Sequence, residues 1–127
     1  MTMNPTSAEQ AHTEVTQRSG ITVVVPPGPR LDAEVAASFR EQLLGLIERG
    51  ERQLVLDLPA VDFIDSSGLG ALVSALKRLR QLDPAGDIRL ANVQPPVRSV
   101  LEIIRLHRVF SQFPTVEDAL ASYEARV

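Results

Sequence analysis

The residues of this chain best suited to chemistry lie in one short run, where an apolar segment stops at an acid and two hydroxyls. The run is Val61-Asp62-Phe63-Ile64-Asp65-Ser66-Ser67-Gly68-Leu69-Gly70. A helix is predicted to begin near Ser66, because leucines then recur at helical spacing at positions 69, 72, 76 and 79. Ser66 falls on the side of this helix opposite the leucines, so we expect its hydroxyl to face solvent. Gly68 and Gly70 each disfavour a helix by roughly 1 kcal/mol relative to alanine, which suggests either close approach by another element or a partner, or simply an easier strand-to-helix turn.

The Asp65-Ser66 pair has a structural and a functional interpretation, and both can hold together. Structurally, one of the two side chains caps the helix by accepting a hydrogen bond from an otherwise unpaired backbone amide. Functionally, an exposed serine at a helix N-terminus can accept a phosphate, which brings about −1.5 to −2 charges near neutral pH. The helix dipole would stabilise that phosphate by roughly 0.3–1 kcal/mol, whereas like charges at a binding interface can cost several kcal/mol. Because ~1.4 kcal/mol changes an affinity tenfold, phosphorylation could release a partner without unfolding the domain.

Catalytic and ligand-binding roles for the same run are less well supported. A nucleophile elbow needs a glycine two positions before the serine, and neither serine of the run has one. A hydrolase would also need a histidine base, for which His107 is the candidate, although a residue at a helix C-terminus is its simpler interpretation. Gly68-Leu69-Gly70 lacks the lysine and the spacing of a phosphate-binding loop, and Asp57 and Asp62 are interpreted as solvated acids. We therefore expect no cofactor, no metal and no enzymatic activity.

The composition indicates one cytoplasmic domain with a protein or small-molecule partner. The chain has 127 residues, 44% of them apolar, which suffices for one modest core. Its net charge of −3 provides no basic field for nucleic acid or for an anionic membrane surface. It contains no cysteine, and no stretch approaches the ~20 consecutive apolar residues of a membrane span. Residues 1–11 are predicted to be a flexible N-terminal tail without signal or anchor character, and residues 12–127 to form the domain.

Strands and helices are predicted to alternate along the rest of the chain. Two strands are expected at 12–17 and 21–25, and a third at 53–58, where a nearly unbroken apolar run suits a strand covered on both faces. Further strands are expected at 88–93 and 109–113. Helices are expected at 32–50, 66–80, 95–104 and from Thr115 onward, with Asp32 as one N-cap and Thr115 with Asp118 as a capping box. The order ββαβαβαβα predicts the α/β class, with helices against a largely parallel or mixed sheet.

In these residues the chain resembles the STAS domain family, and specifically its bacterial anti-sigma factor antagonists. The run from Val61 to Gly70 carries most of the resemblance. It extends over roughly residues 12–125 and includes Arg30-Leu31-Asp32, Leu54-Val55-Leu56-Asp57-Leu58, Arg105 to Phe110 and Glu117-Asp118-Ala119-Leu120. It implies a four- or five-stranded mixed sheet with about four helices packed mainly on one face.

The resemblance also implies a mechanism, partner switching. In the family the unphosphorylated antagonist binds an anti-sigma factor that is itself a serine kinase of the histidine-kinase-like ATPase fold, and a sigma factor is thereby freed for transcription. The kinase phosphorylates the hydroxyl that follows the motif aspartate, which maps to Ser66, and a PP2C-type phosphatase restores the active form. ATP would be bound by the kinase and not by this chain. The partner contacts that the resemblance implies are Arg30, Asp32, Asp65, Ser67, Gly68 and Leu69.

Two segments depart from the family pattern, and two other functions stay open. Pro26-Pro27-Gly28-Pro29 is unusually rich in proline and could reshape the partner surface, and Ile104-Arg105-Leu106-His107 replaces a commoner Thr-Gly step. The first alternative function is a constitutive, non-catalytic scaffold, such as a STAS subunit of a lipid-transport ABC complex or of another signalling assembly. In such a scaffold Ser66 is only a helix cap. The second alternative is a small serine hydrolase, which would react at Ser66 or Ser67.

Overall fold

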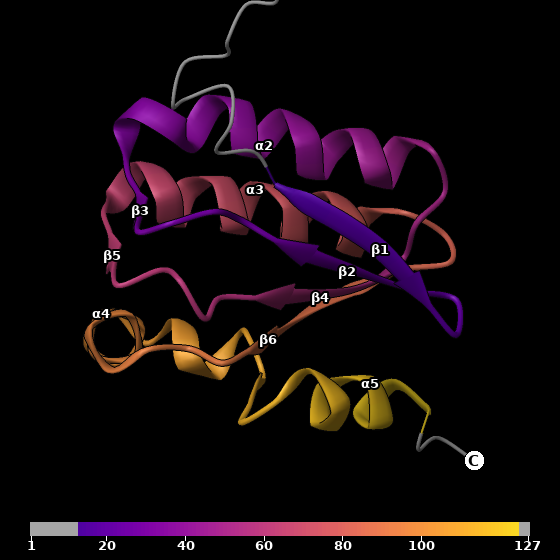
Figure 1. Ribbon diagram of the computed structural model, residues 1–127. Helices are drawn as coiled ribbons and strands as arrows, with labels where there is room; N and C mark the ends of the chain where they lie inside the picture. Colours follow the sequence, from indigo (N-terminus) through magenta and orange to yellow (C-terminus); the bar gives the residue numbers. More distant parts are fainter. Residues whose placement is uncertain (1–12, 125–127) are drawn as a thin grey trace, which may run out of the picture.

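A five-stranded mixed sheet forms the centre of the computed structural model, which describes residues 13–124 (Figure 1). The strand order is β1-β2-β4-β6-β7; β1 runs antiparallel to β2, and the other neighbours pair in parallel. The predicted α/β class with a mixed sheet is confirmed, whereas the predicted tail at 1–11 lies outside the described residues. The strands are β1 Glu14–Arg18, β2 Ile21–Val25, β4 Gln53–Asp57, β6 Asp87–Ala91 and β7 Gln112–Phe113.

Helices cover both faces of this sheet, and those within residues 13–124 lie three on one face and one on the other. Side chains alternate along β4: Leu54 and Leu56 join the hydrophobic cluster under three of the helices, and Val55 joins the cluster under the fourth. All three side chains are fully buried, so the prediction of a strand covered on both faces is correct. Figure 1 shows α2 and α3 side by side above the sheet and α5 below it. The helices of the first face are α2 Ala33–Glu48, α3 Ser66–Gln81 and α4 Pro95–Ile103, and that of the second is α5 Val116–Glu124.

Two further strands of two residues each, absent from the predicted order, lead into the first two helices. β3, Arg30–Leu31, precedes α2, and β5, Phe63–Ile64, precedes α3. The two strands pair in parallel, with Arg30 opposite Phe63 and Leu31 opposite Ile64. This pairing brings the N-termini of α2 and α3 to the same end of the molecule (Figure 1).

The segment predicted as a strand at 109–113 is mostly a turn. A 3₁₀ helix, η1, spans Leu106–Arg108, and only Gln112–Phe113 pair with the sheet. The backbone amides of Val109 and Phe110 both donate to the carbonyl of Leu106, at 2.9 Å each, so they are not available for a strand ladder. Phe110 is instead fully buried in the core under α2, α3 and α4.

Other boundaries differ by a few residues for local reasons. β6 ends at Ala91 and not at Val93, because Asn92 has a φ of 55° and turns the chain out of the strand. α4 ends at Ile103, with Ile104 as its C-cap. The capping interaction expected before α5 is present, since the Thr115 hydroxyl accepts a 3.1 Å hydrogen bond from the amide of Asp118. Within residues 13–124, no helix is long and apolar enough to cross a membrane.

Candidate functional site

Helix α3 begins at Ser66, and Asp65 is its cap. Asp65 has an extended backbone, and its Oδ1 accepts hydrogen bonds from the amides of Ser67 at 2.9 Å and Gly68 at 3.0 Å. Of the two capping residues that the sequence allowed, the acid therefore caps the helix. The side chains of Ser66 and Ser67 are both exposed, as predicted for Ser66. The serine hydroxyl at the first helical position is thus free of a capping role.

The same carboxylate also caps the neighbouring helix. Oδ2 of Asp65 accepts a 3.1 Å hydrogen bond from the amide of Ala33, the first residue of α2. The amide of Asp65 in turn donates to the carbonyl of Leu31 at 3.3 Å. One side chain therefore fixes the starts of two helices, whose N-terminal dipoles both favour negative charge at this surface. A phosphate on Ser66 would lie at such a helix N-terminus.

Arg30 and Asp32 form a second small network beside Asp65. Asp32 caps α2, as predicted, by accepting a hydrogen bond from the amide of Glu34 at 3.1 Å on Oδ1. Its Oδ2 accepts a 2.9 Å hydrogen bond from Nε of Arg30, and this bond lowers the pKa of the Asp32 carboxyl below its ordinary value. The guanidinium of Arg30 also lies 3.9 Å from the centre of the Phe63 ring. Arg30 is thereby held against Phe63 of β5, the strand that leads into the serine site.

The two glycines of the run have different surroundings. A Cβ on Gly68 would lie 2.2 Å from the carbonyl oxygen of Leu31, so this position requires glycine for the close approach of β3 to α3. Gly70 has open space around the same position and is exposed. The expected close approach by another chain element is therefore present at Gly68 and absent at Gly70. Leu69, placed on the core stripe by its spacing, is only half-buried.

The structure adds three surface residues that the sequence reasoning did not single out. Phe63 is 38% exposed, Val73 of α3 is 38% exposed and Val35 of α2 is 39% exposed. The exposure of Phe63 could have been predicted from the sequence, because successive strand residues face opposite sides and the next residue, Ile64, is buried. These apolar side chains extend the candidate partner surface beyond the polar residues of the run.

A shallow hollow adjoins this surface between α2 and the proline-rich segment. Its volume is about 290 Å³, and Arg30 and Val35 belong to its walls. Pro26, Pro27 and Gly28 line it as well, so the departure from the family pattern seen in the sequence does shape this part of the surface. The rest of the lining includes Leu31, Phe39 and Gln42.

Among residues 13–124, no catalytic base is bound to the hydroxyls of the run. His107 lies in η1, and within residues 13–124 no hydrogen bond joins a serine hydroxyl of the run to a histidine. The described part of the chain also holds no group of three or more His, Cys, Asp or Glu residues placed to bind a metal ion. The geometry provides an exposed serine at the start of a helix whose first free amides are bound by Asp65.

Comparisons with known proteins show which family shares this sequence and architecture. A protein named as a candidate anti-sigma factor antagonist, BtrV of Bordetella bronchiseptica, is 35% identical over 95 residues, which are 75% of this chain and 73% of the relative. The anti-sigma F factor antagonist of Paenibacillus polymyxa is 29% identical over 112 residues, 87% of this chain and 93% of the relative. The crystal structure of an anti-sigma factor antagonist from Mycobacterium paratuberculosis has a TM-score of 0.77 at 27% identity and covers 87% of this chain and 91% of that one. The family model described as the STAS domain matches residues 12–119, and the chain therefore belongs to the STAS domain family.

Proposed function

We propose that this STAS domain is an anti-sigma factor antagonist that acts by partner switching through Ser66. The observation that carries the proposal is the exposed hydroxyl of Ser66 at the first position of α3, with the capping role taken by Asp65. The names of the relatives from Bordetella and Paenibacillus support the same class of function, a binding protein without catalysis. In its unphosphorylated form the protein binds an anti-sigma factor, and a phosphate on Ser66 ends the binding.

The local electrostatics allow such a phosphate to change binding without changing the fold. The group adds about −1.5 to −2 charges beside the N-termini of α3 and α2, where helix dipoles stabilise anions by roughly 0.3–1 kcal/mol each. Across an interface built for a neutral hydroxyl, the same charge loses its hydration and meets the acidic groups of the partner. Like charges in contact there can cost several kcal/mol, which corresponds to more than a hundredfold in affinity.

The residues around Ser66 divide into those that shape the surface and those that can reach a partner. Both carboxylate oxygens of Asp65 are used by backbone amides, and Gly68 is pressed against β3, so these two residues position the serine. Ser67 is exposed and Leu69 half-buried on α3, and Arg30 is exposed beside the hollow at α2. We assign these three, with Asp32 holding Arg30 in place, to direct contact with the partner.

The partner that fits this cycle is a serine kinase of the histidine-kinase-like ATPase fold that also serves as the anti-sigma factor. Such a kinase binds the antagonist at the same surface that it later phosphorylates. A PP2C-type phosphatase removes the phosphate and restores binding. The nucleotide belongs to the kinase, so this chain takes part as a protein substrate and a binding partner.

Phosphorylation by purified kinases tests the proposed acceptor directly. Each kinase of this fold from the source organism is incubated with radiolabelled ATP and the wild-type protein, Ser66→Ala or Ser67→Ala. We expect at least one kinase to label the wild type and Ser67→Ala and to leave Ser66→Ala unlabelled. Ser67→Ala is the matched control, since it removes a neighbouring exposed hydroxyl from the same helix turn. Labelling that survives in Ser66→Ala and disappears in Ser67→Ala would contradict the assignment.

A further inference from the structure

Three large apolar side chains lie on the surface where α4 passes into η1. Ile103 is 79% exposed, Ile104 is 45% exposed and Val109 is 43% exposed. Arg105 and Arg108 are exposed between them. All five residues fall within seven consecutive positions, and we call them the Ile-Arg patch. A single exposed apolar side chain is ordinary, whereas several that follow one another with charged residues among them are typical of an interaction surface.

The backbone of the patch is held in a conformation that its sequence does not favour. Arg105 has φ 65° and ψ 21°, the left-handed region that glycine adopts most easily, and the segment still carries arginine there. Strained backbone positions that retain a side chain point to a use for that side chain. At Arg105 the candidate use is the guanidinium itself, because the rest of the side chain is exposed and is not needed by the core.

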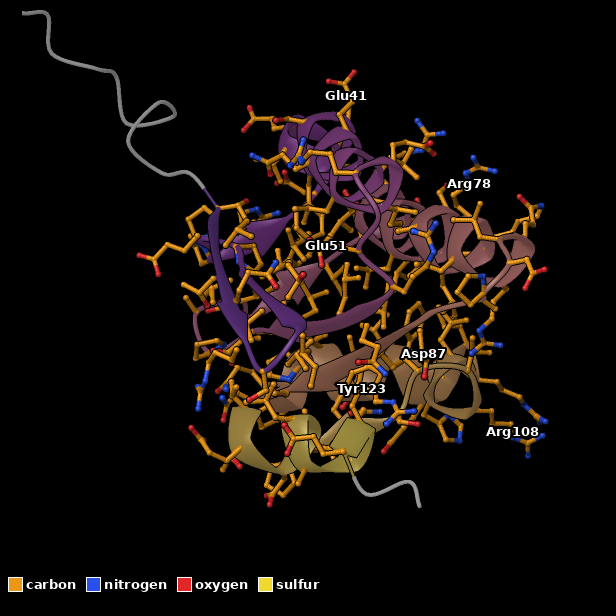
Figure 2. The ribbon with its side chains drawn as sticks, turned by 90° about the vertical axis from the view of Figure 1, so that its right-hand side faces the viewer. Glu41, Glu51, Arg78, Asp87, Arg108 and Tyr123 are labelled. Atoms are coloured by element: carbon orange, nitrogen blue, oxygen red, sulfur yellow. The ribbon has the colours of Figure 1, made fainter. Side chains whose placement is uncertain are left out.

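The two guanidiniums of the patch are not engaged by the part of the chain that the structure describes. Ion pairs among residues 13–124 involve five other arginines, and neither those pairs nor the side-chain hydrogen bonds include Arg105 or Arg108. Figure 2 shows the Arg108 side chain extending away from the body of the molecule. The arginines that do form ion pairs are Arg18, Arg30, Arg78, Arg80 and Arg89.

We propose that the Ile-Arg patch docks a segment of a partner protein in which apolar side chains alternate with carboxylates. Apolar side chains of the segment would cover Ile103, and its carboxylates would pair with Arg105 and Arg108 in the bidentate geometry that guanidinium favours. This patch lies on a different element from Ser66, and its binding does not require the function proposed for that serine.

Two other occupants fit the patch less well. A second copy of this chain meeting the patch face to face would bring the guanidiniums of Arg105 and Arg108 from both copies into one small interface, and the like charges would repel. An anionic membrane surface is recognised by clusters of about 4–8 Lys or Arg residues, whereas the patch supplies two. An acidic, apolar protein segment matches both the charge and the small size of the patch.

NMR titration of ¹⁵N-labelled full-length protein tests the proposal. The probe is a synthetic amphipathic peptide with leucines on one face and glutamates beside them, and the control peptide has lysine in place of each glutamate. We expect the glutamate peptide to shift the amides of residues 103–109 in a saturable manner and the lysine peptide to leave them unchanged. Equal shifts with both peptides, or shifts confined to other elements, would overturn the proposal.

Two variants separate binding from folding. Ile103→Ser should weaken binding of the glutamate peptide roughly tenfold, whereas Val15→Ser, at an exposed apolar side chain on β1 outside the patch, should not. Arg105→Gly relieves the left-handed strain, so its unfolding temperature should not fall, yet its affinity for the peptide should drop several-fold. Full affinity in Arg105→Gly would overturn the proposal. So would vesicle binding with phosphatidylserine, or self-association, that Ile103→Ser abolishes, since either would identify a different occupant.

Discussion

The two ends of the parallel strands both gather polar groups, but they hold them differently. At the serine end, comprising Asp32, Asp65 and Ser66, carboxylates fix the helix starts and leave one hydroxyl exposed. At the tyrosine end, comprising Asp87, Arg89 and Tyr123, the side chains bind one another and the backbone, and Tyr123 is buried. Hydrogen bonds at one end therefore hold an element in place, and those at the other end leave a hydroxyl free on the surface.

The tyrosine end is a structural clamp between α5 and the sheet. The Tyr123 hydroxyl lies 2.8 Å from the carbonyl oxygen of Leu54 and 2.7 Å from that of Asp87, and it can donate to one of them at a time. Burial, reinforced by the nearby Asp87 carboxylate, raises the pKa of this hydroxyl. Arg89 stacks on the ring at 3.9 Å and pairs with Asp87 at 3.1 Å. Figure 2 shows Asp87 and Tyr123 close together beside α5.

The largest effect on stability is expected at the tyrosine end. Tyr123→Ala removes a buried aromatic side chain and should lower the free energy of unfolding by about 3–5 kcal/mol, as measured by chemical denaturation. Tyr123→Phe keeps the ring and should cost only about 1 kcal/mol for the lost hydrogen bond. Phosphorylation of Ser66 in the Tyr123→Phe protein should match the wild type. Much slower phosphorylation of that variant would show that the tyrosine end and the serine end are coupled, and would contradict their separate roles.

The next effect is expected at Gly68, where helix and strand backbones meet. Gly68→Ala places a methyl group against the Leu31 carbonyl and should destabilise the protein by about 1–3 kcal/mol through overpacking. Gly70→Ala is the matched control on the same helix: it has free space and should be neutral or stabilising by up to about 1 kcal/mol. Thermal unfolding of the two variants decides this, and equal midpoints would show that the close approach is absent.

A smaller effect on stability is expected at Asp65, which caps both α2 and α3. Asp65→Ala removes three amide hydrogen bonds at the starts of α2 and α3 and should lower stability by about 1–2 kcal/mol. Asp65→Asn keeps a capping oxygen for α3 and should recover most of this loss. Chemical denaturation at neutral pH measures both. A loss in Asp65→Asn as large as in Asp65→Ala would mean that the charge, and not the cap geometry, stabilises the helix starts.

The smallest expected effect is the pH dependence of stability that Asp32 causes. The pKa of Asp32 is lowered in the folded protein, chiefly by the hydrogen bond from Arg30, so the unfolded chain binds the proton more readily. The resulting stabilisation is fully present above the ordinary pKa of 3.8 and is lost as the pH falls through the lowered value. The stability difference between the wild type and Asp32→Asn should therefore shrink as the pH falls from 6 to about 3. Arg30→Met, which removes the main cause, should largely abolish this pH dependence, and a difference that is constant with pH would contradict the assignment.

Much of the fold followed from the sequence because its long elements have clear periods. The leucine spacing after Ser66 predicted α3, and the apolar run at 53–58 predicted a strand buried on both faces. The strands β3 and β5 were missed because two residues are too few to show a period. The turn at Val109 and Phe110, which follows the 3₁₀ helix, was also missed, since these apolar residues suit a strand equally well and tertiary packing decides between turn and strand.

The residues of the candidate site were predictable from the sequence, but the contacts between residues distant in sequence were not. The exposure of Ser66 followed from helical geometry, and an N-cap before it followed from residue type. The second bond of Asp65, to the start of α2, depends on how two helices distant in sequence come together. The contact of Arg30 with Phe63 likewise depends on the register of two short strands that carry no signal of their own.

Phosphate on Ser66 is proposed to end partner binding while the fold persists. The most direct test is calorimetric titration of the kinase that labels Ser66 with unphosphorylated protein, with protein phosphorylated at Ser66 and with Ser66→Asp, alongside thermal unfolding of the same samples. We predict that phosphorylation weakens binding more than tenfold, that Ser66→Asp weakens it in the same direction, and that all three samples unfold within a few degrees of one another. Unchanged affinity after phosphorylation would contradict the account and leave Ser66 as part of a constitutive scaffold.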